Sequence, residues 1–321
     1  MDYVTFGRTG LKVSVAGLGC GGNSRLGQGQ GKSEADSIAI VRKAIDLGVN
    51  LIDTAANYGT EGIVGKALKG IPRDKVVIAT KATIRDGGNM CTADQVVASL
   101  ENSLRLLQTD FIDVFQLHAV PPGRYDRVMQ ELAPALLREK EKGKFRHLGL
   151  TETSPQDHKH ETMQRVAKDP VWESVMLGFH MMHQNARRLV FPDTVANGTG
   201  TLLMFVVRNI FSQPDYLRST VKELVEDGKL PAEMAKADNP LGFLIHEGGA
   251  SSLTDAAYRF VRHEPGVHVV LFGTGNPAHV ETNIASILKP ALPKADAEKL
   301  AKLFGHLEGV GLDLPDRSAR R

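Results

Sequence analysis

The sequence predicts an α/β fold, specifically a closed (β/α)8 TIM barrel preceded by an N-terminal β-hairpin. Two observations support it. Short apolar runs rich in β-branched residues alternate with amphipathic stretches of helical period along the whole chain. Strands separated by helices pair in parallel, and about eight such units fit a chain of 321 residues. An open doubly wound sheet is the alternative architecture. No shift in composition divides the chain, so residues 1–321 are expected to form one domain.

The N-terminal half begins with a hairpin over residues 3–14 that turns near Gly10. Capping-box patterns at Ser33 and Thr92 mark two helix starts, and Gly48 ends the first of these helices. The expected strands are 15–18, 49–53, 75–80 and 111–117, and the expected helices are 33–47, 60–70, 92–107 and 127–144.

The C-terminal half continues the alternation. Asn276 followed by Pro277 is a typical helix start. Residues 208–250 form a connection longer than usual, and a barrel would place this long loop on the active face as a lid or wall. The expected strands are 145–151, 173–179, 201–207 and 266–273, and the expected helices are 156–168, 185–191, 215–227, 253–263, 276–288 and 294–307.

The segment Gly17–Gly22 reads G-x-G-x-x-G, the dinucleotide-binding pattern of Rossmann folds. That motif needs a helix immediately after it. Gly27, Gly29 and Gly31 follow instead, and each glycine inside a helix costs about 1 kcal/mol. The sequence therefore argues against a Rossmann unit, and residues 20–31 are expected to form a loop.

Composition excludes several functional classes. The net charge is +2 with no basic run that contains aromatics, so no nucleic-acid partner is expected. Cys20 and Cys91 are too few for a disulfide framework and fit the reduced thiols of a cytoplasmic protein. No secretory signal is seen, and the longest apolar run, 202–207, is too short for a membrane span. Residues 317–321 are expected to form a solvated tail. No pattern predicts an oligomeric state.

Four reactive side chains end the second, third and fourth predicted strands or lie in the loop that follows one of them. Because the carboxyl ends of barrel strands meet on one face, these side chains are expected to share a pocket. The four residues are Asp53, Tyr58, Lys81 and His118.

This combination suits proton donation to a carbonyl group. A tyrosine has a pKa of about 10 and donates poorly at neutral pH. The Lys81 ammonium at hydrogen-bond distance would lower the pKa of Tyr58, since it supplies about 4 kcal/mol at an effective dielectric constant near 20. Asp53 would keep Lys81 charged, and His118 would orient the oxygen that is reduced.

Each residue also has a structural interpretation. Asp53 could cap a helix, and Tyr58 could pack at a rim. Lys81 could extend to solvent from a strand end, and His118 could bond a backbone carbonyl. Their occurrence together at consecutive strand ends favours the catalytic interpretation.

Five segments carry a resemblance to the aldo/keto reductase family. They are residues 7–22, 48–68, 76–81, 113–118 and 266–284. The resemblance covers nearly the whole chain, and its most specific part is the Asp-x4-Tyr…Lys…His set. It implies a TIM barrel that reduces aldehyde, ketone or sugar carbonyls with NAD(P)H, by hydride from the nicotinamide and a proton from Tyr58. It also implies that Lys81 and Asp53 tune Tyr58 and that His118 positions the substrate oxygen.

The resemblance also implies the cofactor contacts. NADP is the cofactor expected from the resemblance to the family. NAD is the alternative, because NADPH-preferring members place a lysine or arginine where this chain has Gly273 and His279, and histidine is a weaker phosphate partner than arginine. Gly19, Cys20, Gly21 and Asp53 would border the nicotinamide. Gly273, Thr274 and Gly275 would bind phosphate at a helix N-terminus, and Thr282 and Asn283 would contact the adenine end.

Three departures from the family pattern affect this assignment. Thr151-Glu152 stands where the family has Ser-Asn for the carboxamide, and the glutamate loses the amide donor. Phe179 lies near the place of the aromatic that stacks on the nicotinamide, with core packing as the alternative. Arg208 lies in a segment that differs from the family segment that wraps the pyrophosphate. It could contact a phosphate, or it could be a solvated surface residue.

Other functions stay open at this point. One is a nucleotide-binding regulatory subunit with slow turnover, and another is a metal-dependent barrel hydrolase, although the His-x-His of its first strand is absent. His158, His160, His180 and His183 lack metal-ligand spacing, so no metal is expected. The substrate walls would come from 20–31, 119–125 and 208–250, with Phe211, Tyr216, Phe243 and His246 as candidates.

Overall fold

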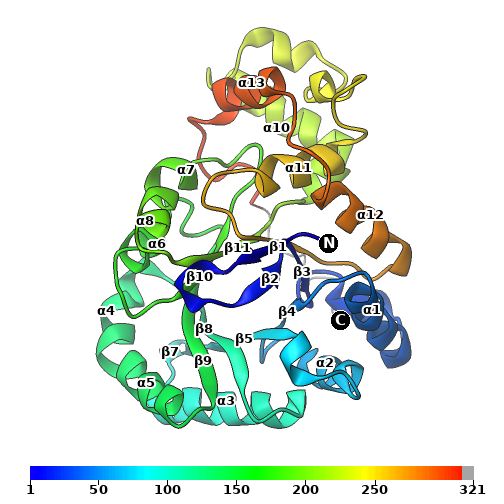
Figure 1. The fold of residues 1–321 in the computed structure, drawn as a ribbon. Helices are drawn as coiled ribbons and strands as arrows, with labels where there is room; N and C mark the ends of the chain where they lie inside the picture. Colours follow the sequence, from blue (N-terminus) through cyan, green and yellow to red (C-terminus); the bar gives the residue numbers. More distant parts are fainter. Residues whose placement is uncertain (313–321) are drawn as a thin grey trace.

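Eight parallel strands form a closed barrel in the computed structural model, which describes residues 1–312 (Figure 1). Consecutive barrel strands pair in parallel, and the last pairs with the first to close the ring. The predicted TIM barrel is confirmed, whereas the tail expected over 317–321 lies outside the described residues. The strands are β3 (Ala16–Gly19), β4 (Leu51–Asp53), β5 (Val77–Thr83), β8 (Ile112–Val120), β9 (Phe145–Glu152), β10 (Ser174–Gly178), β11 (Gly200–Met204) and β12 (Val269–Phe272).

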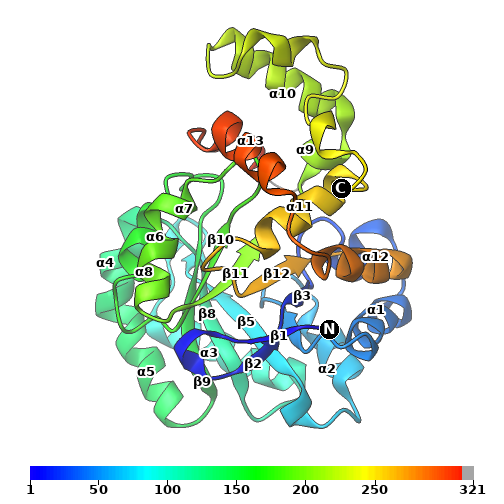
Figure 2. The same ribbon diagram turned by 45° about the horizontal axis from the view of Figure 1, so that its top comes forward.

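Helices surround the strands (Figures 1 and 2). Both predicted capping boxes are present, at Ser33 and at Thr92. A short ribbon after β5, formed by β6 (Arg85–Asp86) and β7 (Asn89–Met90), was not predicted. The helices around the barrel are α1 (Glu34–Asp46), α2 (Glu61–Leu68), α3 (Ala93–Leu107), α4 (Tyr125–Arg127), α5 (Ala133–Glu141), α6 (Glu161–Val166), α7 (Ala186–Leu189), α8 (Phe191–Ala196), α11 (Leu253–Arg262) and α12 (Pro277–Ile287). The chain continues into α13 (Lys294–Phe304), which lies at the top of Figure 1.

Three expected helices differ from the prediction. The helix expected over 185–191 ends at Leu189, and α8 begins at Phe191. The helix expected over 156–168 is confined to α6, because the Asp157 carboxylate accepts from the backbone N–H groups of Glu161 and Thr162 and so starts the helix there. The helix expected over 127–144 contains a π-helical turn at Val128–Leu132. Pro134 has no N–H to donate to the preceding turn, which accounts for the change in winding at this point.

The segment 208–250, expected as a long loop, is largely helical. It contains α9 (Asn209–Ser212), the predicted helix α10 (Pro214–Glu226) and 3₁₀ turns at Ala232–Lys236 and Gly242–Leu244. With α13 it forms the projection at the top of Figure 1. The His306 imidazole bonds the Lys229 carbonyl at 3.0 Å. The expected loop is therefore a folded unit beside the barrel.

The N-terminal hairpin, β1 (Tyr3–Thr5) and β2 (Lys12–Ser14), is confirmed, and it covers the amino end of the barrel. Phe6 and Val13 are fully buried in a cluster with side chains from the first residues of several barrel strands. Gly200 makes this possible, because a Cβ atom there would lie 2.7 Å from the Phe6 ring. The Arg8 guanidinium donates to the carbonyls of Pro170, Trp172 and Asn197.

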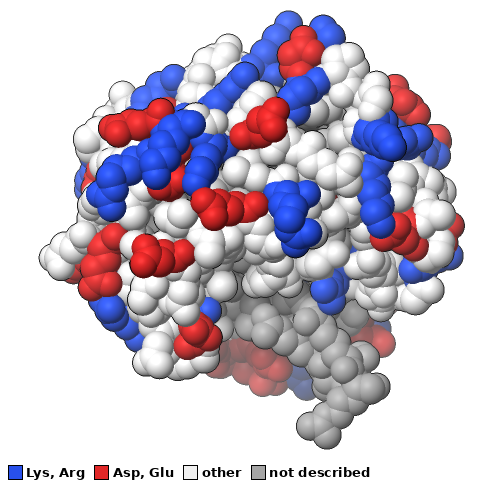
Figure 3. Space-filling model, turned by 90° about the horizontal axis from the view of Figure 1, so that it is seen from below, with Lys and Arg blue, Asp and Glu red and all other residues white. Residues whose placement is uncertain are grey.

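The face seen in Figure 3 carries interspersed positive and negative side chains. Ion pairs connect neighbouring elements, as where Lys144 bridges Glu101 on α3 and Glu139 on α5, each at 2.6 Å. No helix among residues 1–312 is long and apolar enough to span a membrane.

Candidate active site

A cleft of about 810 Å³ opens at the carboxyl ends of the barrel strands. Asp53 and Tyr58 line one part of it, and Arg208 and one face of α12 line another. Four glycines contribute backbone to its wall, namely Gly19, Gly21, Gly22 and Gly273. The cleft is the place where a barrel enzyme concentrates its chemistry.

A buried ion pair lies at the base of the cleft. Lys81 is fully buried, and its Nζ donates to both Asp53 carboxylate oxygens at 2.7 and 2.8 Å and to the Thr54 carbonyl at 2.7 Å. Three acceptors match the three donors of an ammonium, so Lys81 is charged. Burial by itself would lower the pKa of Lys81, but Asp53 outweighs burial and raises it above 10.5.

Tyr58 lies above this ion pair. Its Oη is 3.5 Å from His118 Nε2, and the Lys81 Nζ is 5.2 Å from its ring centroid. The expectation of a lowered Tyr58 pKa is wrong for this site. Burial raises the pKa above 10.0, and the Lys81 charge opposes this rise without reversing it. The phenol is therefore held in its protonated form.

His118 projects from a β-bulge near the end of β8. The pairing with β9 shifts register between Leu117 and Val120, and Ala119 adopts a left-handed φ of 55°. The backbone N–H of Ala119 donates to Thr151 Oγ1 at 2.8 Å. Burial, and secondarily the Lys81 charge, lowers the pKa of His118 to about 3. His118 is thus a neutral imidazole at physiological pH.

The structure brings the four predicted catalytic residues together. A protonated phenol lines the cleft, a neutral imidazole lies beside the phenol oxygen, and a cation is held by its carboxylate next to them. This arrangement can hold a carbonyl oxygen between Tyr58 and His118 and give it a proton.

Most predicted cofactor residues lie at or beside the cleft. Cys20 is buried just behind it, with its N–H on the Asp53 carbonyl at 2.8 Å. Asn276 caps α12 by accepting from the Ala278 N–H at 3.0 Å, and Thr274 Oγ1 accepts from Asn276 N. Gly275 lies in the same turn against Gln30. The predicted residues that line the cleft are Gly19, Gly21, Asp53, Arg208, Gly273, His279, Thr282 and Asn283.

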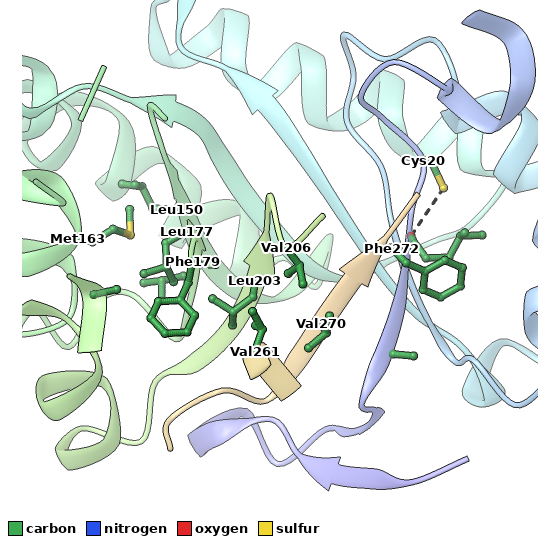
Figure 4. Close-up of a cluster of buried hydrophobic side chains, with 14 of the residues drawn as sticks. Cys20, Leu150, Met163, Leu177, Phe179, Leu203, Val206, Val261, Val270 and Phe272 are labelled. Atoms are coloured by element: carbon green, nitrogen blue, oxygen red, sulfur yellow. Dashed lines mark hydrogen bonds between the residues drawn. The ribbon is translucent and has the colours of Figure 1, made fainter. Parts of the chain in front are cut away.

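Three predicted cofactor residues are buried away from the cleft lining. The Thr151 hydroxyl accepts the hydrogen bond from the Ala119 N–H in the β8 bulge. Glu152 accepts from the Gly178 N–H at 2.6 Å and from the Ser154 hydroxyl at 2.9 Å. Phe179 is fully buried and lies near Leu177 in the core cluster of Figure 4. It packs on Phe191 and Phe260, with ring centroids 5.2 and 5.8 Å away.

Glu152 also belongs to a buried charged network that the sequence did not predict. His160 Nδ1 lies 2.6 Å from Glu152 and its Nε2 lies 3.0 Å from Asn185 Oδ1. The Asn185 amide donates to the His158 carbonyl, which fixes Oδ1 as the acceptor. His160 therefore donates from both nitrogens as an imidazolium. Burial opposes this charge, but Glu152 outweighs burial and raises the pKa of His160.

The other buried histidines serve the backbone. His180 Nδ1 accepts from the Met182 N–H, and His183 Nδ1 accepts from the Gly309 N–H. Residues 1–312 contain no group of three or more His, Cys, Asp or Glu side chains arranged to hold a metal ion.

The sequence missed three aromatic residues of the cleft, Tyr258, Phe272 and Phe205. Phe205 follows β11, adopts a left-handed φ of 63° and lines the cleft. The Arg208 guanidinium lies 4.4 Å from the centroid of its ring. An aromatic residue immediately after an apolar strand is the signal that could have identified it.

The four candidate substrate-wall residues lie in the folded unit beside the barrel and are not among the side chains that line the described cleft. Phe211 packs on His180 with centroids 5.2 Å apart. Phe243 lies under the Lys299 ammonium, and His246 lies 3.0 Å from Asp296. Tyr216 packs against the hydrophobic core.

The chain is similar to known proteins in both sequence and fold. Residues 17–304 match the model of the aldo/keto reductase family. The chain is 28% identical over 318 residues to L-galactose dehydrogenase of Arabidopsis thaliana, with 97% of this chain and 95% of that protein covered. It is 30% identical over 309 residues to the aldo-keto reductase YhdN of Bacillus subtilis (strain 168), with 88% and 87% covered. The fold is similar to the holo form of aldo-keto reductase AKR11C1 from Bacillus halodurans, with a TM-score of 0.71, 21% identity and 100% of both chains covered.

Proposed function

This chain belongs to the aldo/keto reductase family of oxidoreductases, and we propose that it reduces the carbonyl of an aldehyde, ketone or sugar to an alcohol with NAD(P)H. The observation that carries the proposal is the Tyr58–His118 pair, whose facing atoms lie 3.5 Å apart beside the buried Lys81–Asp53 ion pair, with Tyr58 lining the cleft. The reaction is reversible, so the same residues would serve the oxidation of an alcohol.

The residues of the cleft fit a nicotinamide dinucleotide. Part of the cleft wall is bare backbone at Gly19, Gly21 and Gly273, which lets a ligand approach the main chain. The capped N-terminus of α12 offers the positive end of a helix dipole to a phosphate. His279, Thr282 and Asn283 would border the adenosine half, and Phe205 offers a ring face beside Met204.

We favour NADP(H) over NAD(H). Arg208, Lys289 and His279 all line the cleft and can pair with an additional phosphate. Lys289 is shared with Asp255, whose carboxylate lies 3.0 Å from its Nζ, and this weakens its pull on a ligand. NAD(H) therefore stays the alternative cofactor.

A bound reduced nicotinamide would supply the hydride. Tyr58 gives its phenolic proton to the carbonyl oxygen, and His118 holds the same oxygen. The phenolate left behind faces the Lys81 ammonium, which stabilises it. Asp53 keeps this lysine charged throughout. The residues of the chain thus orient the carbonyl oxygen, supply one proton and provide a fixed positive charge beside the phenolate.

We propose a small-molecule carbonyl substrate and a cytoplasmic location. Cys20 and Cys91 are both free and buried, which fits a reducing compartment.

The test is cofactor oxidation by the purified full-length chain. NADPH and NADH absorbance at saturating cofactor are followed with aromatic aldehydes, ketones and sugar aldehydes. Turnover with at least one carbonyl class is expected. Tight nucleotide binding without turnover of any carbonyl would instead favour the regulatory subunit.

A further inference from the structure

The bulge that presents His118 is unusual in its hydrogen bonding. Leu117 pairs with Leu150, and Val120 pairs with Glu152, so His118 and Ala119 together stand opposite the single residue Thr151. The extra residue of a bulge normally leaves its backbone N–H without a partner in the ladder. Here the Ala119 N–H donates to the side-chain oxygen of Thr151 at 2.8 Å.

The same place carries backbone strain. Ala119 has a φ of 55°, a region that residues with a Cβ atom adopt at a cost. Such a conformation persists where surrounding contacts over-determine it. Thr151 is 1% exposed, so its hydroxyl meets little competition from water for the Ala119 N–H.

The direction of His118 depends on this bulge. Side chains alternate along a strand, so loss of the extra residue would change the register beyond Leu117 and move the imidazole. Tyr58 Oη and His118 Nε2 lie 3.5 Å apart, at the limit of hydrogen bonding. A displacement of about 1 Å at such a site costs about 100-fold in rate.

We infer that Thr151 is a positioning residue, whose hydroxyl holds the left-handed bulge at Ala119 and thereby sets the place of His118 in the site. This inference rests on the proposed carbonyl reduction, in which His118 orients the substrate oxygen. It assigns to Thr151 a task different from the cofactor contact that the sequence suggested.

The test uses three variants of the full chain. Thr151→Val keeps the shape and removes the acceptor, whereas Thr151→Ser keeps the hydroxyl. The double variant Thr151→Val/Ala119→Gly removes the acceptor but places at 119 a residue that adopts positive φ freely. The readouts are the Kd for NADPH by fluorescence titration, kcat and KM for the carbonyl at saturating cofactor, and a crystal structure of Thr151→Val.

For Thr151→Val we expect kcat/KM for the carbonyl to fall about 10- to 100-fold, with the Kd for NADPH unchanged within about twofold. Thr151→Ser should retain the wild-type activity. The double variant Thr151→Val/Ala119→Gly should regain part of the activity that Thr151→Val loses. The crystal structure should show a relaxed bulge and a displaced His118.

Two results would overturn the inference. One is a weakened Kd for NADPH with an unchanged kcat, which would make Thr151 a cofactor contact. The other is an unchanged bulge and Tyr58–His118 distance in the crystal. An inactive wild-type chain would refute the proposed function instead, and the crystal structure would still decide the role of Thr151.

Discussion

The ring of Tyr58 lies so close to Gly21 that a Cβ atom on this glycine would stand 2.4 Å from Tyr58 Cε2. Gly21→Ala should therefore displace the phenol and lower kcat/KM about 100-fold or more. Steady-state kinetics with the best carbonyl substrate checks this expectation. Gly62→Ala is the matched control, because its Cβ would meet no heavy atom closer than 4.0 Å. Equal activities of the two variants would contradict the assigned place of Tyr58.

Tyr58→Phe removes the proton donor and keeps the ring. We expect kcat to fall by about 10²- to 10⁴-fold, the usual contribution of a general acid, while the Kd for NADPH stays unchanged. Single-turnover kinetics and fluorescence titration measure the two quantities separately. A normal kcat would show that another group delivers the proton.

Lys81→Met should destabilise the fold as well as abolish activity. It would leave the Asp53 carboxylate buried without its cation, a change that costs about 3–5 kcal/mol. Urea denaturation measures this loss. The double variant Lys81→Met/Asp53→Leu should regain stability and stay inactive. If the single variant kept the wild-type stability, the ion pair would have no structural role.

The His160–Glu152 pair predicts a pH-dependent stability. The pKa of His160 is raised in the folded state, so its contribution is complete below its ordinary pKa of 6.5 and is lost as pH rises through the raised value. The difference in free energy of unfolding between wild type and His160→Gln should therefore shrink from acid toward alkaline pH. Denaturant titrations at several pH values test this. A difference that grows with pH would mean that His160 is neutral when folded.

His279 is exposed beside the cleft, where an arginine would pair better with a phosphate. His279→Arg should tighten NADPH binding about threefold to tenfold and leave the Kd for NADH nearly unchanged, as expected for an exposed charged contact. Titrations at low and high salt measure both, since the gain should fade with salt. An equal gain for both cofactors would place the extra phosphate elsewhere.

The sequence predicted that Asp53, Lys81 and His118 would lie together, because each stands at or near the carboxyl end of a strand and barrel topology brings such ends together. It also predicted where α12 begins, since Asn276-Pro277 is a local signal. These predictions needed no knowledge of side-chain contacts.

The remaining differences depend on contacts between distant residues. Phe179 follows β10, where both faces of a parallel strand are apolar, so the pattern could not tell cleft from core. Glu152 is enclosed by partners that include His160 and the Gly178 N–H. The bulge at Ala119 leaves no trace in the alternation of polar and apolar residues.

The N-terminal hairpin plugs one mouth of the barrel with Phe6 and Val13. Bulk water near Tyr58 then enters from the opposite mouth, through the same cleft that would admit the carbonyl and the nucleotide. With both ligands bound, that passage would be filled. Reprotonation of the Tyr58 phenolate would then have to wait until the alcohol product leaves. In the proposed reaction, the packed interior of the barrel and the hairpin beneath it would together couple reprotonation of Tyr58 to emptying of the site.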